Sequence, residues 1–414
     1  MTIRIIAPGR QVTAASANGN GVNISIDGHH FVVEANPGDN IQLQLDNGSV
    51  DLPPANDDDR RRGWRRLNAN NALAFGVDED KVVVLPACNM NDWMSGLPDD
   101  RAVADLTIPG THESASLYGG FISQCQNHDV GQQLQHGIRF FDIRLKSKNG
   151  QLETYHGIQA QDSTLQQQVE WIENFLRQNP RETVILSIKQ EQEDAEDFPQ
   201  LVQDALSSGM WHFDENVPTL GDVRGKGIFF SRFGKKRDDQ FPNGQGLKPL
   251  SWPDNRGEGF DVDWHGTAFR IHDWYDTENI GEKTSRICNF LESTCDGRGA
   301  GVGPNHPMSI VFASGGKFPQ APPHWMASGG SAGGMSQVLS VGANLFGKIS
   351  GGGGGGGGGG QETGPEGGVN ARLVRWLLNK AMEGRRPRAI LNLDFYDETN
   401  AMQELIAALN ALPE

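Results

Sequence analysis

The sequence predicts an α/β fold: a (β/α) barrel of the TIM type, regular or distorted, with a β-rich accessory module at the N-terminus. Two patterns carry this prediction. From about residue 98 onward, apolar segments of strand length alternate with segments of helical periodicity, which indicates a parallel sheet covered by helices. Residues 1–85 instead alternate apolar and polar side chains between glycine, asparagine and proline turns, which is typical of short antiparallel strands.

Residues 1–85 contain strand candidates at 22–26, 30–34 and 41–45 and no helix of convincing length. We interpret this part as a β-rich accessory module. An N-terminal arm that packs on the main domain is an equally good interpretation of the same pattern. In either case the 414 residues leave enough chain for one large barrel domain at 86–414.

The predicted barrel strands lie at 102–108, 139–145, 183–189, 227–232, 268–272, 308–313 and 389–395. Several are nearly continuous apolar runs, as expected for strands that are covered on both faces. Helices are predicted at 130–136, 164–178, 197–207, 282–292, 370–382 and 399–409. In 164–178, apolar residues recur at helical spacing from Leu165 to Leu176, which places them on one helix face.

A glycine-rich insertion interrupts the barrel domain at about 328–368 and includes ten consecutive glycines at 351–360. Such a tract cannot form a packed core, so we expect a flexible loop. The mildly apolar stretch 338–349 fits a short helix that rests on the barrel better than a helix that touches lipid.

Composition excludes several functions and locations. The formal net charge of −16 argues against nucleic-acid binding and against firm docking on anionic membranes. No segment approaches the roughly 20 apolar residues of a membrane span, and no signal peptide is visible at the N-terminus. We expect a soluble protein, either cytoplasmic or secreted with its leader removed. The four cysteines lack metal-site spacing, and Cys288 and Cys295 fit either a local disulfide or free thiols.

Ionisable residues stand at or near the ends of the predicted strands. They are His112 with Glu113, Asp142 with Arg144, His156, Lys189, Arg232, Asp273 with Tyr275, and Asp394. The carboxyl ends of parallel barrel strands converge on one mouth, where catalytic groups lie. Each residue alone fits a structural role, and Asp142 and Arg144 fit a plain ion pair on one strand face. The whole set indicates an active site.

Three of these segments resemble motifs of bacterial phosphatidylinositol-specific phospholipases C. LTIPGTHES, ending at Ser114, resembles the family's IPGTH-D-S element, GIRFFDIR, ending at Arg144, resembles its GIRYFDIR strand, and Tyr155-His156-Gly157 resembles its second-histidine motif. The following strand, 182–189, is also similar. The resemblance is strong at about 93–232 and looser toward the C-terminus, and residues 1–85 have no counterpart.

The resemblance implies cleavage of phosphatidylinositol to diacylglycerol and inositol 1,2-cyclic phosphate, without a metal or another cofactor. It implies that His112 is the general base, that His156 is the general acid and that Arg144 binds the phosphate oxygens. Asp394 would orient His112, and Asp142 would lie against the acid side of the site. The inositol would contact Lys189, Arg232, Asp273 and Tyr275.

The chain departs from the family pattern at Glu113, where the family usually has Asp, so efficiency or substrate preference could differ. Two alternatives stay open: a related phosphodiesterase acting on glycerophosphodiesters, glycosyl-phosphatidylinositol anchors or another headgroup, and a catalytically silent barrel that binds inositol or carbohydrate. We expect a monomer that contacts a membrane surface transiently. The nine tryptophans fit either an inserted rim, with Trp325 as the test site, or an ordinary core.

Overall fold

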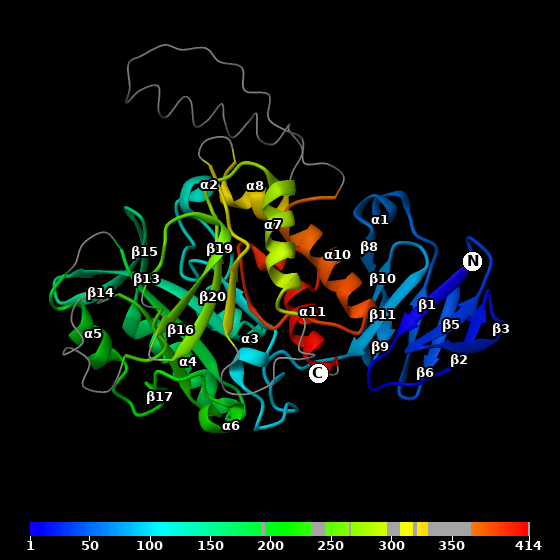
Figure 1. Ribbon diagram of the computed structural model, residues 1–414, viewed down its shortest axis with the longest axis horizontal. Coiled ribbons are helices and arrows are strands. Elements are labelled where there is room, and N and C mark those ends of the chain that lie inside the picture. Colours follow the sequence, from blue (N-terminus) through cyan, green and yellow to red (C-terminus); the bar gives the residue numbers. More distant parts are fainter. Residues whose placement is uncertain are drawn as a thin grey trace, which may run out of the picture.

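The computed structural model describes residues 1–191, 195–233, 245–249, 251–264, 266–295, 307–317, 321–329 and 366–412. Within these residues, one sheet around a common core contains seven main parallel strands and a short eighth (Figure 1). The seven main strands are β12 (Ile108–Thr111), β13 (Phe140–Lys148), β16 (Val184–Gln190), β18 (Gly227–Arg232), β20 (Thr267–Asp273), β21 (Met308–Phe312) and β22 (Ile390–Leu393). Along the sheet the order is β18-β16-β13-β12-β22-β21-β20, with the short β17 (Trp211–His212) outside β18.

The sheet curves into a barrel that hydrogen bonds leave open on one side. Among the described strands, no ladder joins β18 to β20, and the antiparallel β19 (Arg256–Trp264) borders β20 instead. The rings of Phe230 and Phe269 meet edge to face at this side, with their centroids 5.7 Å apart. Backbone pairing on this side of β18 is with Leu247 rather than with β20, and the barrel is distorted.

Alternation along the strands separates an inner from an outer core. Phe140 belongs to the cluster inside the barrel, whereas Phe141 packs outward against the helices. The outer layer includes α3 (Val130–Gln135), α4 (Leu165–Gln178), α5 (Phe198–Ala205), α7 (Ile280–Glu292), α10 (Val369–Met382) and α11 (Met402–Ala408). On α4, the apolar residues of the predicted face are buried, as expected from their spacing.

The prediction is wrong for the first barrel strand. Residues 102–108 do not form a strand: Val103–Asp105 is a 3₁₀ helix, and β12 begins only at Ile108. The apolar side chains of Val103 and Leu106 pack into the inner cluster of the barrel. Their hydrophobicity therefore reflects closure of the barrel base rather than a place in the sheet.

The N-terminal part consists of two sheets with their own apolar core. One has the order β4-β5-β1-β11-β10-β8 and the other the order β3-β2-β6-β7-β9. Their strands are β1 (Thr2–Ile6), β2 (Val12–Ala17), β3 (Asn20–Val22), β4 (Ile24–Asp27), β5 (His30–Glu34), β6 (Ile41–Leu45), β7 (Gly48–Leu52), β8 (Trp64–Arg66), β9 (Asn68–Asn70), β10 (Ala72–Val77) and β11 (Lys81–Pro86). The strand predicted at 22–26 is divided between β3 and β4. Only a short helix, α1 (Asp57–Arg62), interrupts these strands.

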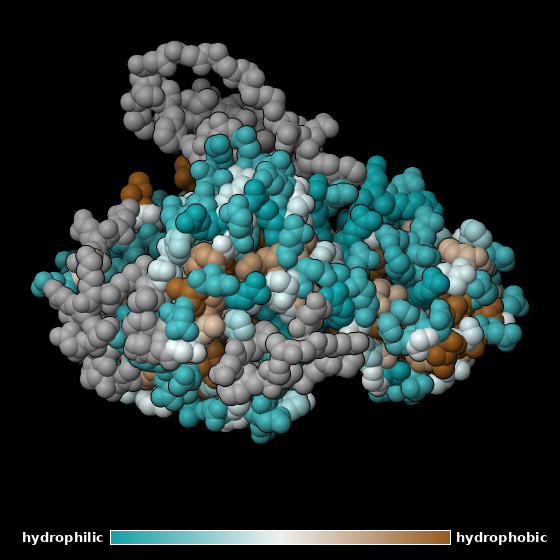
Figure 2. Space-filling view, in the orientation of Figure 1, coloured by the Kyte–Doolittle hydropathy of each residue, from teal (hydrophilic) through white to brown (hydrophobic). Residues whose placement is uncertain are grey.

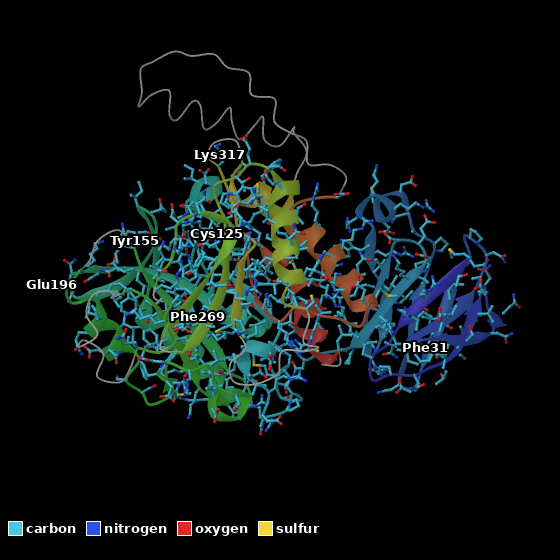
Figure 3. All side chains as sticks on the ribbon, in the orientation of Figure 1. Phe31, Cys125, Tyr155, Glu196, Phe269 and Lys317 are labelled. Atoms are coloured by element: carbon cyan, nitrogen blue, oxygen red, sulfur yellow. The ribbon has the colours of Figure 1, made fainter. Side chains whose placement is uncertain are left out.

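This N-terminal β module packs on the barrel domain through α10. Phe75 and Val83 of the module share one apolar cluster with Val369, Leu373 and Leu377 of α10. Figure 3 labels Phe31 in the module and Phe269 inside the barrel. The module is thus both a sheet pair with its own core and a partner in the core of the barrel domain.

The predicted helix at 338–349 and the glycine tract at 351–360 lie outside the described residues. Before this stretch, α8 (Pro323–Ser328) follows β21, and α10 begins after it. None of the described helices is both long and apolar enough to cross a membrane.

Candidate active site

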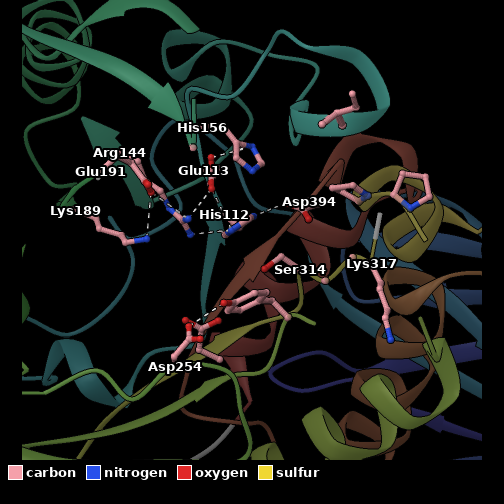
Figure 4. Close-up of a pocket in the computed structure, with 18 of the residues that line it drawn as sticks. His112, Glu113, Arg144, His156, Lys189, Glu191, Asp254, Ser314, Lys317 and Asp394 are labelled. Atoms are coloured by element: carbon pink, nitrogen blue, oxygen red, sulfur yellow. Dashed lines mark hydrogen bonds and ion pairs between the residues drawn. The ribbon is translucent and has the colours of Figure 1, made fainter. Parts of the chain in front are cut away.

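A cavity of about 520 Å³ opens where the parallel strands end (Figure 4). Its lining includes nine of the ten residues singled out in the sequence: His112, Glu113, Arg144, His156, Lys189, Arg232, Asp273, Tyr275 and Asp394. The tenth, Asp142, is fully buried behind the wall and contacts Arg144 and Arg232. The fold therefore gathers the whole predicted set at one site.

His112 directly follows β12, and its backbone N–H donates to the carbonyl of Leu393 at the end of β22 (3.0 Å). Its Nδ1 lies 2.9 Å from Asp394 Oδ1, and its Nε2 lies 2.9 Å from Arg144 Nη2. A guanidinium can only donate, so Nε2 accepts and the proton of the neutral ring lies on Nδ1, facing Asp394. This tautomer leaves the lone pair of a general base on Nε2.

Two opposing effects set the basicity of His112. Burial lowers the pKa of the imidazole, but the charge and the hydrogen bond of Asp394, together with the charge of Glu113, outweigh burial, so the pKa lies above its ordinary value. The positive charge of Arg144 acts with burial, in the lowering direction. Asp394 thus makes His112 a stronger base as well as fixing its tautomer.

Arg144 lies on β13 at the centre of the site. Its Nη1 is 2.6 Å from Glu113 Oε1, and its Nη2 is 3.2 Å from Asp142 Oδ2. Burial alone would lower the pKa of Arg144, but the charges of Glu113 and Asp142 raise it well above the ordinary value. The guanidinium is therefore a fixed cation beside His112, suited to hold phosphate oxygens.

Asp142 contacts two arginines rather than the acid side of the site, where the sequence placed it. Its Oδ1 lies 3.1 Å from Arg232 Nη1, and its Oδ2 accepts from the backbone N–H of Glu113 (3.2 Å). Burial would raise the pKa of Asp142, but the charges of Arg144 and Arg232 lower it well below its usual range. Asp142 is thus an ionised anchor that aligns both guanidiniums.

Glu113 connects Arg144 to His156. Its backbone has a positive φ of 41°, and its side chain is 2% exposed. While Oε1 contacts Arg144, Oε2 lies 3.1 Å from His156 Nδ1. The longer side chain therefore reaches both groups at once, which bears directly on the departure from Asp noted in the sequence.

His156 ends β14 (Gln151–His156), which forms an antiparallel hairpin with β15 (Gln159–Thr164) beside the extended end of β13. Its Nδ1 lies 2.7 Å from the carbonyl oxygen of Ser123, so Nδ1 carries a proton. Nε2 is the ring nitrogen that remains for a leaving oxygen to approach. His156 comes from a hairpin, whereas His112 comes from the end of a barrel strand.

The proposed inositol-binding residues form a second group in the cavity. Arg232 lies over the ring of Trp252, with Cζ 3.7 Å from the centroid, and Trp252 Nε1 donates to Asp273 Oδ2 (2.8 Å). Tyr275 donates its hydroxyl hydrogen to Asp254 Oδ1 (2.8 Å), and burial together with this bond raises the pKa of Tyr275 to about 12. Cationic and acidic groups on an aromatic floor suit a polyhydroxylated ring.

Sequence reasoning missed several residues of the site. Trp252 and Asp254 come from the loop before β19, which has no periodicity to reveal them, and the buried Ser314 follows β21. Glu191 lies 3.1 Å from Lys189 Nζ and 3.5 Å from Arg144 Nη1. Its position two residues after Lys189, at the end of β16, was the available signal.

One group in the described part of the chain has metal-ligand proximity: His112, Cys125 and Asp394 offer donor atoms within 4.8 Å of one another. The donor set fits a cation poorly. Burial raises the pKa of the Cys125 thiol well above its ordinary value, so it is protonated, whereas a metal binds the thiolate. In addition, the Arg144 guanidinium already contacts His112 Nε2.

Comparison with known proteins agrees with this geometry. Residues 102–232 match the family described as phosphatidylinositol-specific phospholipase C, X domain. The chain is 36% identical over 173 residues to a 1-phosphatidylinositol phosphodiesterase of Listeria monocytogenes, covering 38% of this chain and 54% of the relative. It is 25% identical over 218 residues to the enzyme of the same name from Staphylococcus aureus (48% and 69% covered). The match thus spans about half the length of the Listeria relative.

The fold is shared with a crystal structure of a phosphatidylinositol-specific phospholipase C from Staphylococcus aureus. The TM-score is 0.57 at 18% identity, and the match covers 77% of this chain and 97% of that chain. The fold class is therefore confirmed as a TIM-type α/β barrel. Within it, residues 102–232 match the X-domain family of these phospholipases, so the resemblance seen in the sequence is confirmed as well.

Proposed function

We propose that this protein cleaves phosphatidylinositol to diacylglycerol and inositol 1,2-cyclic phosphate by general acid–base catalysis. The observation that carries the proposal is that His112, Arg144 and His156 line one cavity, with Arg144 against His112 and Glu113 between Arg144 and His156 (Figure 4). The names of the relatives, 1-phosphatidylinositol phosphodiesterases, support the substrate class.

The reaction proceeds in line. His112 Nε2 takes the proton of the inositol 2-hydroxyl, and that oxygen attacks the phosphorus while Arg144 holds the non-bridging oxygens. The bond from phosphorus to the glycerol oxygen breaks, and His156 Nε2 donates the proton that makes diacylglycerol. Asp394 stabilises the His112 imidazolium and Glu113 the His156 imidazolium. Lys189, Arg232, Asp273 and Tyr275 bind the inositol ring.

Phosphorus NMR of the products formed from phosphatidylinositol vesicles tests this proposal. A cyclic inositol phosphate is expected, because the attacking oxygen belongs to the substrate. The same assay with EDTA tests the role of Arg144. Activity should persist with chelator, and full loss would overturn the assignment of Arg144 as the cation of the site.

A related phosphodiesterase activity is the second candidate. The cavity offers a separate polar group for the headgroup, and glycerophosphodiesters or glycosyl-phosphatidylinositol anchors carry the same phosphodiester. Parallel assays of glycerophosphodiesters, glycosyl-phosphatidylinositol anchors and phosphatidylinositol rank these three substrates by their rates of cleavage. A barrel that binds inositol without turnover would show affinity for inositol and no product at all.

We propose transient contact with a lipid surface at the mouth of the cavity. Ile158, in the turn after His156, is 86% exposed, and Ile122, in α2 (Gly120–Ser123), is 48% exposed and lines the cavity. Figure 2 shows small apolar groups that project from a largely hydrophilic surface near α2 and the tip of the β14–β15 hairpin. Trp325 is 6% exposed, which favours an ordinary core position for this tryptophan over the inserted rim. Vesicle sedimentation should weaken for Ile158→Asn.

We also propose the division of the chain into an accessory module at 1–85 and a catalytic barrel at 86–414. The module has its own core between two sheets, and the cavity draws on barrel residues alone. Because one chain supplies every group of the site, we expect a monomer to be active. A specific activity that does not change with enzyme concentration, together with a monomeric mass by light scattering, would support this.

A further inference from the structure

The first turn of α10 contacts the residue that orients the proposed base. Asn370, which is 1% exposed, donates its Nδ2 hydrogen to the backbone carbonyl of Asp394 (2.8 Å). The carboxylate of the same Asp394 lies 2.9 Å from His112 Nδ1. One side chain of α10 thus holds the backbone of the residue whose carboxylate holds His112.

This contact matters because the sheet no longer fixes Asp394. Strand β22 ends at Leu393, so Asp394 lies beyond the last residue of the ladder with β12. The next residue, Phe395, has a positive φ of 44°, which an L side chain rarely adopts. A backbone that leaves a strand into such a turn keeps its position only through further contacts, and Asn370 supplies one of them.

The opposite side of the same turn of α10 contacts the N-terminal β module. Trp64, at the start of β8, is 1% exposed and donates its Nε1 hydrogen to the carbonyl of Ala371 (2.9 Å). Ala371 is the neighbour of Asn370 along the chain. Adjacent residues of one helical turn are therefore bonded to the module on one side and to Asp394 on the other (Figure 1).

A close fit holds Trp64 against α10. Gly63, which precedes it, has a φ of 76°, and a Cβ at this position would lie 2.5 Å from Arg375 Nε. Arg375 also pairs with Asp78 of the module (Nη2 to Oδ1, 3.1 Å). In addition, the ring of Phe75 packs edge to face on Trp64, with centroids 6.3 Å apart. The indole therefore has little freedom to move away from the helix.

We infer that the N-terminal β module helps to position the general base of the barrel. Trp64 fixes the first turn of α10, Asn370 passes this constraint to Asp394, and Asp394 sets the orientation and the basicity of His112. Trp64 and Asn370 are positioning residues, since neither lines the cavity. The importance of this chain of contacts for turnover rests on the proposed function, whereas its effect on the pKa of His112 does not.

The test compares three variants by NMR titration of the His112 ring and by the pH profile of phosphatidylinositol cleavage. Asn370→Leu removes the bond to Asp394 at nearly constant volume, and Trp64→Phe removes the bond to Ala371 while keeping an aromatic ring. Trp93→Phe is the matched control, because Trp93 donates an equally long bond (2.9 Å) to the carbonyl of Gly137, away from α10. Circular dichroism shows that each variant is folded.

We expect the pKa of His112 to fall in Asn370→Leu and, by less, in Trp64→Phe, because Asp394 no longer holds its carboxylate as firmly against the ring. The acid limb of kcat/KM should move to lower pH in both variants. We expect kcat to fall about tenfold in Asn370→Leu and about threefold in Trp64→Phe, with KM little changed. The double variant should resemble Asn370→Leu alone, since both substitutions act through one path. Trp93→Phe should leave the pKa and the pH profile as in the wild type.

An unchanged His112 titration in both Asn370→Leu and Trp64→Phe would overturn the inference, as would losses in kcat that multiply in the double variant. A wild type that does not cleave phosphatidylinositol would instead overturn the proposed function. In that case the NMR titration still decides whether the module acts on His112, so the two failures are distinguishable.

Discussion

The two imidazoles of the site are held in different ways. His112 follows a barrel strand, its side chain is 14% exposed, and charged partners contact both of its ring nitrogens. His156 ends a hairpin, its side chain is 25% exposed, and in the described part of the chain only its Nδ1 has partners. The proposed base is therefore fixed in advance, while the proposed acid keeps Nε2 free for a leaving oxygen.

Removing the two histidines should separate these roles most strongly. His112→Ala should lower kcat about 10³-fold on every substrate, because the attacking hydroxyl loses its base. His156→Ala should cause a comparable loss on phosphatidylinositol but a much smaller one on a p-nitrophenyl inositol phosphate, whose leaving group needs no proton. Steady-state rates on both substrates check this. Equal losses of the two variants on the nitrophenyl substrate would contradict the assignment of acid and base.

Replacing Glu113 should weaken the acid side more than the base side. Glu113→Gln removes the charge next to His156 Nδ1, and we expect kcat on phosphatidylinositol to fall about 10- to 100-fold. Glu191→Gln is the matched control, because Glu191 also contacts Arg144 but no histidine. The nitrophenyl substrate should suffer less from Glu113→Gln, since it does not need the acid. A loss in the control as large as that in Glu113→Gln would show that Glu113 acts only through Arg144.

Replacing Asp394 should shift the pH dependence of the base side. His112 must be neutral to accept a proton, so activity falls as the pH drops through its pKa. Asp394 raises that pKa, and Asp394→Asn should therefore move the acid limb of kcat/KM to lower pH. We also expect about 10-fold to 100-fold lower kcat, because the imidazolium loses its partner. A limb that stays in place, or moves to higher pH, would contradict the role of Asp394.

The smallest expected effect is on folding stability and concerns Lys283, which lies behind His112. This buried lysine on α7 donates to the carbonyls of Trp274 and Phe312, and the ring of Phe312 lies edge to face against His112. Burial lowers the pKa of Lys283 to about 7. Between pH 7 and its unfolded pKa near 10.5, the unfolded chain holds a proton that the folded chain has released, so stability rises with pH in this window.

Urea denaturation of the wild type and of Lys283→Met at pH 7 and 9.5 measures this contribution. The difference in unfolding free energy between the two proteins should change in favour of the wild type as the pH rises, by at most about 1.4 kcal/mol per pH unit. The other groups that titrate in this range are common to both proteins and cancel. A difference that does not change with pH would mean that Lys283 stays protonated in the fold.

Most of the barrel and the cavity could be predicted from the sequence, because apolar strands and polar strand ends have local signatures. Strand β18 was predicted from its apolar run, and the buried face of α4 from helical periodicity. The segment 102–108 was mistaken for a strand because an apolar run does not reveal whether it pairs or closes the base of a barrel. Residues in irregular loops, such as Trp252 and Asp254, have no such signature.

The contacts within the site were less predictable than its membership. Asp142 and Arg144 share a strand face, which gave their pairing, but the contact of Asp142 with Arg232 joins strands distant in the sequence. The roles of Asn370 and Trp64 depend on how a helix packs between two parts of the chain. Such long-range packing follows from the complete fold and not from local patterns.

The apolar cluster shared by the module and α10 has a consequence for handling the protein. A chain shortened to 86–414 would present the side chains of Val369, Leu373 and Leu377 to water without the cover of Phe75 and Val83. Contiguous exposed apolar surface of this kind promotes self-association. The barrel produced alone should therefore precipitate or form oligomers, and a proteolytic cut near residue 86 should leave both pieces bound together.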